Sequence, residues 1–236
     1  MGVAFTFRDG DPTPTREEDA VPERELSTTG YLILGLLAAR DWSAYQLAEQ
    51  LGRGVSELWP SADRGRYAVL NRLSEAGFVE TRQEHTGKRA RTIYAITAAG
   101  RQALAAWLST PVKPPTLEFE GMVRVMLSDQ GSIDDLRGTL SRTREQALAN
   151  REMFARYAAF ISETGGTFPE RRHLFALANT YMIGHYDHIL AWADWAEEQI
   201  ADWPDTVTPA TTNGGQVRDM LAPGRAVWGE GGSTEA

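Results

Sequence analysis

Basic side chains that could contact nucleic acid are concentrated between Ser61 and Arg101, although the chain as a whole is acidic. The formal net charge is −8. This segment holds eight arginines and lysines and four carboxylates, a local charge of +4, so the remainder carries −12. Affinity for nucleic acid depends on the cations close to the phosphates and not on the total charge. The segment is therefore a candidate DNA-binding surface.

Two arginines lie near the start of an expected helix in this segment. A recognition helix contacts base edges through its N-terminal residues, and one arginine can bond both O6 and N7 of guanine. Arg64 and Arg66 could therefore bind bases or phosphates, and Asn71 could read adenine if the helix enters the groove deeply. The alternative is that these are ordinary solvated side chains. We expect Tyr67 in the core, with a hydroxyl that could also meet a phosphate.

A second basic group surrounds an expected turn at Thr86-Gly87. A basic hairpin of this kind can follow the phosphate backbone or enter the minor groove. Next to a basic helix, it favours a winged helix-turn-helix bound to duplex DNA. The predicted DNA-binding residues are Tyr45, Ser61, Arg64, Arg66, Tyr67, Asn71, Arg72, His85, Lys88, Arg89 and Arg91.

The elements that must position these residues begin with two helices. Ser27 can cap an apolar and therefore buried helix over Thr28–Ala39, which a short turn at residues 40–42 follows. Ser43-x-x-Gln46 is a capping box that opens a second helix to about Leu51. Its inner side is expected to consist of Tyr45, Leu47, Ala48 and Leu51.

A third helix is predicted from residues 61–63 to Ala76. Its inner stripe is Tyr67, Leu70 and Leu73, and Gly77 fits a left-handed helix stop. Alternating residues then predict paired strands at 78–83 and 91–96. Thr97 can cap a further helix that ends near Leu108.

Beyond a proline-rich boundary, the longest periodic segment follows the capping pair Ser132 and Asp135. Apolar positions recur at alternating steps of three and four over about 30 residues, a pattern typical of a helix packed along another long helix. We expect this seam to form a homodimer interface together with a final helix from Pro169 to about Trp203. Asn150 either sets the register of that interface or lies at its solvent-exposed edge. The predicted dimer contacts are Ile133, Leu136, Leu140, Ala147, Asn150, Phe154, Tyr157 and Ile161.

The predicted fold is mainly α. It comprises a flexible N-terminal arm (1–25), a winged helix-turn-helix domain of three helices and a two-stranded wing (26–110), a helical dimerisation and effector domain (116–203), which includes a short helix over 118–127, and a disordered tail (204–236). Apolar aromatic walls suit a small hydrophobic or aromatic effector. A helix-bundle core explains the same residues equally well. The candidate effector residues are Met122, Met126, Tyr181, Trp192 and Trp195.

Enzymatic chemistry finds no support in the sequence. The chain has no cysteine, no glycine-rich phosphate loop and no Gly-x-Ser-x-Gly motif. His185 and His188 could share a helix face, but two ligands are too few for a metal site, so packed histidines are the favoured interpretation and no cofactor is expected. With neither a secretion signal nor a membrane-length apolar run, we expect a cytoplasmic protein.

Several of these motifs resemble the PadR family of transcriptional regulators over about residues 26–203. They are Tyr31-Leu-Ile-Leu-Gly-Leu-Leu37, Tyr67-x-x-Leu-x-x-Leu-x-x-Ala-Gly77, Tyr94-x-Ile-Thr-x-x-Gly100 and Gly184-His-Tyr-Asp-His-Ile-Leu-Ala-Trp192. The resemblance implies a homodimer that represses transcription and releases DNA when a small molecule binds. The alternative is a dimeric winged-helix adaptor that binds protein and not DNA.

Overall fold

The computed structural model describes residues 26–52, 58–59, 65–86 and 89–222. Internal contacts divide the chain between Thr110 and Pro111 into two units, which are described separately. The expected N-terminal arm and residues 223–236 lie outside the described residues. The fold is mainly α-helical with one small antiparallel sheet, as the sequence predicts.

The first unit begins with helix α1 (Thr28–Ala39), the two-residue strand β1 (Trp42–Ser43) and helix α2 (Ala44–Gly52). Ser27 caps α1 as predicted, because its hydroxyl accepts the Gly30 N–H over 3.2 Å. The predicted capping box is also present: Gln46 N–H donates to Ser43 Oγ (3.3 Å), and Ser43 N–H donates to Gln46 Oε1 (3.0 Å). Both helix starts are thus specified by local sequence.

Helix α4 (Arg66–Glu75) begins later than predicted. Gly65 has φ of +69°, a left-handed conformation that cannot continue a right-handed helix, so a helix running unbroken from residues 61–63 is wrong. The helix end agrees with prediction. Gly77 has φ of +74°, and the N–H groups of Gly77 and Phe78 donate to the carbonyls of Ser74 and Leu73. This is a Schellman stop, which directs the chain into the next strand.

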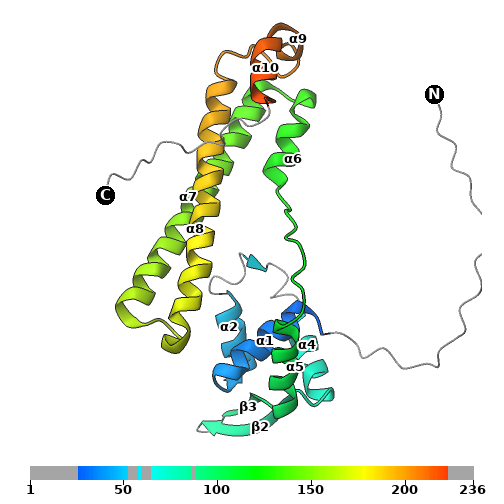
Figure 1. Ribbon diagram of the computed structural model, residues 1–236, viewed down its shortest axis with the longest axis vertical. Helices are drawn as coiled ribbons and strands as arrows, with labels where there is room; N and C mark the ends of the chain where they lie inside the picture. Colours follow the sequence, from blue (N-terminus) through cyan, green and yellow to red (C-terminus); the bar gives the residue numbers. More distant parts are fainter. Residues whose placement is uncertain (1–25, 53–57, 60–64, 87–88, 223–236) are drawn as a thin grey trace, which may run out of the picture. The chain divides into compact units, whose positions relative to one another are not determined.

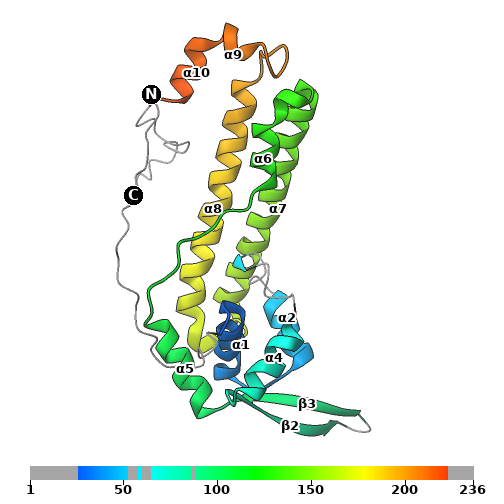
Figure 2. The same ribbon diagram turned by 90° about the vertical axis from the view of Figure 1, so that its right-hand side faces the viewer.

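Strands β2 (Val79–Thr86) and β3 (Arg89–Ile96) form the wing, which Figure 2 shows extending beyond the helices of this unit. Thr86 pairs with Arg89, so Thr86 belongs to the strand and not to the turn as predicted, and the strands are longer than expected; Gly87 lies outside the described residues. The strand order is β1-β3-β2, because Trp42 of β1 pairs with Tyr94. Strand β1 was not predicted, since a two-residue strand has no detectable alternation in the sequence.

Helix α5 (Ala98–Leu108) closes this unit. Thr97 caps it as predicted, accepting the Gly100 N–H over 3.1 Å, while its hydroxyl donates to the Gly77 carbonyl over 2.7 Å. A Cβ at Gly100 would lie 2.3 Å from the Phe78 carbonyl oxygen, so glycine allows this close approach. The most deeply buried core residues are Ile33, Leu34, Leu37, Leu47, Leu51, Leu70 and Leu73.

The second unit is built on two long helices, α7 (Ile133–Thr164) and α8 (Arg172–Gln199), which lie side by side in Figure 1. Ser132 and Asp135 form the predicted capping box at the start of α7. The short helix α6 (Glu120–Met126) packs against α7, and the 3₁₀ turns η2 (Ser128–Gln130) and η3 (Pro169–Arg171) connect the elements. Helix α8 lies inside the range predicted for the last long helix, Pro169 to about Trp203.

The periodic seam of α7 packs against α8 of the same chain. Leu136 and Leu140 contact Trp192, Ala193, Ala196 and Ile200, and Ala147 and Phe154 contact Met182 and Tyr186. A long partner helix exists, as the pattern predicts, but it is not in a second subunit. Five predicted dimer contacts, Leu136, Leu140, Ala147, Phe154 and Ile161, are buried within one chain, and Ile133, Asn150 and Tyr157 are partly buried. The five buried residues are thus covered within the chain, and the assignment of this set to a subunit contact stays a prediction.

The C-terminal segment is ordered farther than predicted. Helices α9 (Pro209–Thr212) and α10 (Gly214–Met220) lie in the region expected to be disordered. Gln216 explains their attachment: its Oε1 accepts the Trp203 indole N–H over 3.2 Å, and its Nε2 donates to the Gln199 carbonyl over 2.9 Å. The Thr206 hydroxyl also donates to the Gly131 carbonyl over 3.3 Å. Composition alone could not reveal these specific contacts.

Candidate nucleic-acid interface

Three tyrosines and one arginine gather where α2, α4 and β3 meet. They line a surface hollow of about 690 Å³, which we call the tyrosine groove and define by Tyr45, Tyr67, Arg91 and Tyr94. Ser43, Gln46 and Thr92 add polar groups to its lining, and Glu49 adds one carboxylate. Aromatic rings, hydroxyls and a guanidinium on an open surface suit a phosphate backbone, since tyrosine and arginine both donate to phosphate oxygens.

Two of these tyrosines are more exposed than predicted. Tyr45 was expected on the inner side of α2 but is 76% exposed, and Tyr67 was expected in the core but is 56% exposed. On α4, the residues that face the core of the unit are Val69, Leu70 and Leu73. The buried stripe of α4 thus contains Val69 in place of the predicted Tyr67. Both tyrosines also appear in the predicted DNA-binding set, and their exposure agrees with that assignment.

Other predicted DNA-binding residues lie on the surface of this unit. Asn71, Arg72, His85 and Arg91 are exposed. The Arg72 guanidinium Nε donates to the Ala68 carbonyl over 3.3 Å, which directs this side chain back along α4. Ser61, Arg64 and Lys88 lie outside the described residues, as do the side chains of Arg66 and Arg89.

Carboxylates that the sequence analysis did not single out neutralise part of the wing. Glu84 forms ion pairs with Arg91 at 2.9 Å and with Arg82 at 3.0 Å, and Asp41 binds Arg82 at 2.5 Å. Hydrogen bonds from Arg91 and then Arg82 lower the pKa of Glu84. Hydrogen bonds to Asp41 and then Glu84 raise the pKa of Arg82. Both pKa shifts favour the ionised forms of Glu84 and Arg82.

The predicted effector residues do not form one site. Met122, Trp192 and Trp195 belong to the packed cluster between α6, α7 and α8. Met126 and Tyr181 are exposed, and Tyr181 stacks on His185 with ring centroids 6.3 Å apart. The three packed residues are therefore bundle core, one of the two interpretations that the sequence left open.

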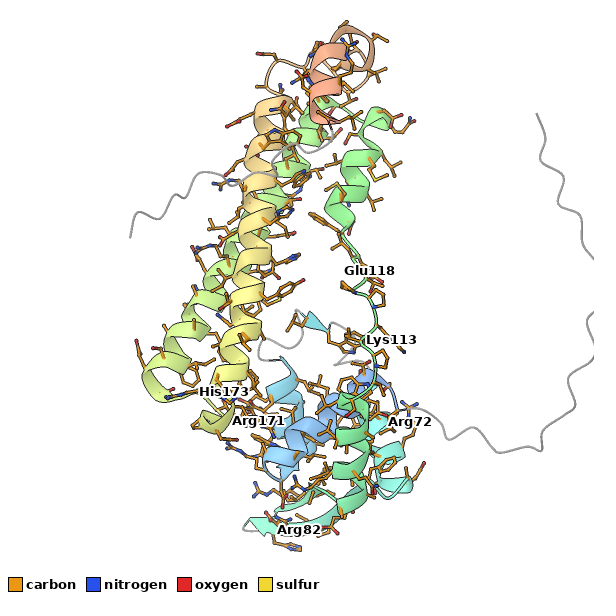
Figure 3. All side chains as sticks on the ribbon, in the orientation of Figure 1. Arg72, Arg82, Lys113, Glu118, Arg171 and His173 are labelled. Atoms are coloured by element: carbon orange, nitrogen blue, oxygen red, sulfur yellow. The ribbon has the colours of Figure 1, made fainter. Side chains whose placement is uncertain are left out.

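Near the start of α8 a different set of residues lines a groove of about 410 Å³. It includes Arg172, His173 and Asn179 on α8, and Figure 3 shows His173 at this end of the helix. Asn179 is buried, and its Oδ1 has no hydrogen-bond partner among the described residues.

His185 packs against two aromatic rings, since it also meets Tyr186 edge-on at 5.3 Å.

Within the described ranges, no three histidine or acidic side chains are placed to hold a metal ion. No helix in those ranges combines the length and apolar character needed to cross a bilayer.

Two family models match the chain. Residues 33–106 match the transcriptional regulator PadR-like family, and residues 120–201 match the C-terminal model of virulence activator alpha. The chain is 25% identical over 171 residues to the negative transcriptional regulator PadR of Bacillus subtilis, which covers 70% of this chain and 92% of the relative. It is also 29% identical over 86 residues to a probable transcriptional regulator of Mycobacterium tuberculosis, covering 36% of this chain and 45% of the relative.

Solved structures of the same fold come from several bacteria. Bacillus subtilis PadR in complex with operator DNA has a TM-score of 0.63 at 20% identity, covering 74% of this chain and 99% of that chain. The same regulator in complex with p-coumaric acid has a TM-score of 0.58 at 20% identity, covering 73% and 98%. The virulence activator AphA of Vibrio cholerae has a TM-score of 0.54 at 23% identity, covering 74% and 97%.

Proposed function

This chain belongs to the PadR-like family of transcriptional regulators, and from that premise we propose that it binds operator DNA as a homodimer and represses transcription until a small molecule binds. The observation that carries DNA binding is the tyrosine groove, which brings together α2, α4 and the wing. These are the elements through which winged helix-turn-helix proteins contact duplex DNA. Repression is supported by the name of the Bacillus subtilis relative.

The test of DNA binding starts with the purified full chain and fragmented genomic DNA. Retained fragments are sequenced, and a recovered site is compared with a random duplex by fluorescence anisotropy at several salt concentrations. A winged-helix regulator retains discrete sites and loses affinity as salt rises, since counterion release drives phosphate binding. A chain retained neither by heparin nor by any duplex would instead be a protein-binding adaptor.

An exposed apolar stripe on α8 supports the homodimer. Leu174, Leu177 and Tyr181 follow helical spacing on one face and are all exposed, with Leu177 at 72%. Contiguous exposed apolar residues mark interaction surfaces, and a symmetric operator requires two copies of the DNA-binding unit. We therefore assign a second copy of this chain to the stripe, in place of the buried seam of α7.

Sedimentation velocity tests this interface. Leu177→Glu places a charge in the stripe and should shift the dimer towards monomer. Leu221→Glu, at an exposed apolar residue after α10, introduces the same charge elsewhere and should leave the dimer intact. Unchanged sedimentation of both variants would remove α8 from the interface.

The groove at the start of α8 supports ligand response. It combines the basic side chains of Arg172 and His173 with the carboxamide oxygen of Asn179, which no described residue bonds, and with apolar walls from Ala158, Ile161 and Ala176. A few polar groups in an otherwise apolar hollow are typical of small-ligand sites. With p-coumaric acid as the probe, the wild-type chain should gain thermal stability and release DNA, and Asn179→Leu should do neither. Equal responses from both proteins would exclude this groove.

A further inference from the structure

The carboxylate of Glu84 occupies two arginines of the wing at once. Its Oε2 accepts from Arg91 Nη2 over 2.9 Å, and its Oε1 accepts from Arg82 Nη2 over 3.0 Å and from Arg82 Nε over 3.3 Å. Glu84 and Arg91 are direct cross-strand partners in the β2–β3 register, so the strand pairing fixes their approach. Charge-assisted contacts of this kind orient both guanidinium groups towards Glu84.

The two arginines are not equivalent, because Arg82 has a second carboxylate. Asp41, next to β1, binds Arg82 Nη1 over 2.5 Å, and Arg91 has no contact with Asp41 among the described interactions. The four side chains together carry no net charge. This part of the wing, two residue pairs from the end of the β2–β3 ladder, is thus close to neutral, although a count of its arginines suggests a cationic surface.

This network lies beside the proposed DNA contact. Arg91 lines the tyrosine groove with Tyr45 and Tyr67, and Figure 3 shows Arg82 on the β2–β3 hairpin. The Arg91 and Glu84 side chains are 47% and 35% exposed, so a phosphate can reach the pair. Solvent-exposed ion pairs are weak, and the guanidinium can exchange a carboxylate for a phosphate. Glu84 would then lie close to the DNA without its partner.

We propose that Glu84 restrains the electrostatic affinity of the wing for duplex DNA by holding Arg91, so that random duplex gains little from this part of the surface. The proposal rests on the DNA binding proposed above. An unspecific duplex is bound almost entirely through phosphates. A carboxylate that removes one cation from that contact, and adds a like charge near the backbone, therefore weakens random binding and favours sites at which other residues contribute base contacts.

Glu84→Gln is the direct test, measured by anisotropy with a random duplex over a salt series. Releasing Arg91 to one phosphate should raise affinity about threefold or more and steepen the logarithmic salt dependence by about 0.9. Arg82 keeps Asp41, so we expect the gain of one phosphate contact and not two. Asp41→Asn combined with Glu84→Gln should add a second increment of similar size.

Glu80→Gln is the matched control. Glu80 is exposed on the same strand and makes no ion pair within the described part of the chain. Its substitution by glutamine changes the net charge by the same amount as Glu84→Gln. Its effect on affinity should be clearly smaller than that of Glu84→Gln. In an Arg91→Gln background, Glu84→Gln should no longer steepen the salt dependence.

Three results would overturn the proposal: equal effects of Glu80→Gln and Glu84→Gln, the same effect of Glu84→Gln with and without Arg91, or weaker binding by Glu84→Gln. The last would mean that Glu84 orients Arg91 for DNA instead of restraining it. Failure of the wild-type chain to bind any duplex is a different outcome, because it would contradict the proposed function itself.

Discussion

Asn150 donates a hydrogen bond from Nδ2 to the Tyr186 hydroxyl over 3.3 Å and so joins α7 to α8 within one chain. Tyr186 is buried, and its ring stacks on Phe154 with centroids 5.9 Å apart. The polar residue in the α7 seam is therefore satisfied by the neighbouring helix. A role of Asn150 in the register of a subunit interface stays a prediction.

Asn150→Ala should lower the free energy of unfolding by about 1 kcal/mol, because it removes the hydrogen bond between Asn150 and the Tyr186 hydroxyl. Urea denaturation measures the loss, and Tyr186→Phe should produce a similar one. Sedimentation of the folded variant should match that of the wild type. A change in oligomeric state at unchanged stability would instead support a role of Asn150 at the subunit interface.

Gly100→Ala should destabilise the first unit. The added Cβ would lie 2.3 Å from the Phe78 carbonyl oxygen and 2.9 Å from Ile96, so the backbone must shift. Overpacking of this kind costs about 1–3 kcal/mol. Gly35→Ala is the control: nothing lies within 4 Å of its Cβ, and in mid-helix alanine should stabilise by about 0.4–1 kcal/mol. Equal unfolding midpoints for the two variants would contradict the close approach at Gly100.

Tyr67→Ala and Leu70→Ala should separate binding from stability on one helix. Leu70 is 1% exposed, and its truncation should cost about 2–5 kcal/mol. Tyr67 is exposed in the tyrosine groove, so its loss should weaken duplex binding with little change in thermal unfolding. Thermal denaturation and anisotropy on the same samples measure both effects. A large loss of stability in Tyr67→Ala would show that the Tyr67 ring packs in the core, and would contradict the prediction.

Asp135→Asn should make the second unit less sensitive to acid. Hydrogen bonds from the Ser132 hydroxyl and backbone lower the pKa of Asp135 from its ordinary 3.8. A lowered folded-state pKa stabilises the fold above the unfolded value, and this contribution disappears as pH falls through the folded value. The wild type should therefore exceed the variant in stability at neutral pH, and the difference should shrink below about pH 3.8. A constant difference across that range would contradict the prediction.

Local signals in the sequence predicted most helix boundaries correctly. Ser27, Ser43, Thr97 and Ser132 each bond the backbone within three residues, so their short-range patterns suffice to place a helix start. Contacts between distant residues were harder. The ordering of α9 and α10 depends on such a contact, made by Gln216 to Gln199. The start of α4 was missed for a local reason, the left-handed conformation of Gly65.

The wing shows why the charge network escaped prediction. The predicted strands at 78–83 and 91–96 leave Glu84 in the connection between them, whereas the observed ladder pairs Glu84 directly with Arg91. The basic residues were identifiable from composition, but their neutralisation required the register.

For the seam of α7, the sequence predicted the kind of contact but not the chain that provides it. Its spacing correctly predicted a long helical partner, yet spacing cannot distinguish a helix of the same chain from one of another. Leu174, Leu177 and Tyr181 are exposed because α8 packs against α7 through a different face. The sequence pattern of α8 did not distinguish these two faces.

The attachment of Gln216 to Gln199 and Trp203 has a practical consequence for shortened forms of the protein. A version ended near residue 201, where the second family match stops, would remove both Trp203 and Gln216, and with them the hydrogen bond to the Gln199 carbonyl at the end of α8. Fraying from that end would then loosen the packing of Ile200 on Leu136. Biophysical work on this regulator should keep residues through 222, even if no DNA contact lies among them.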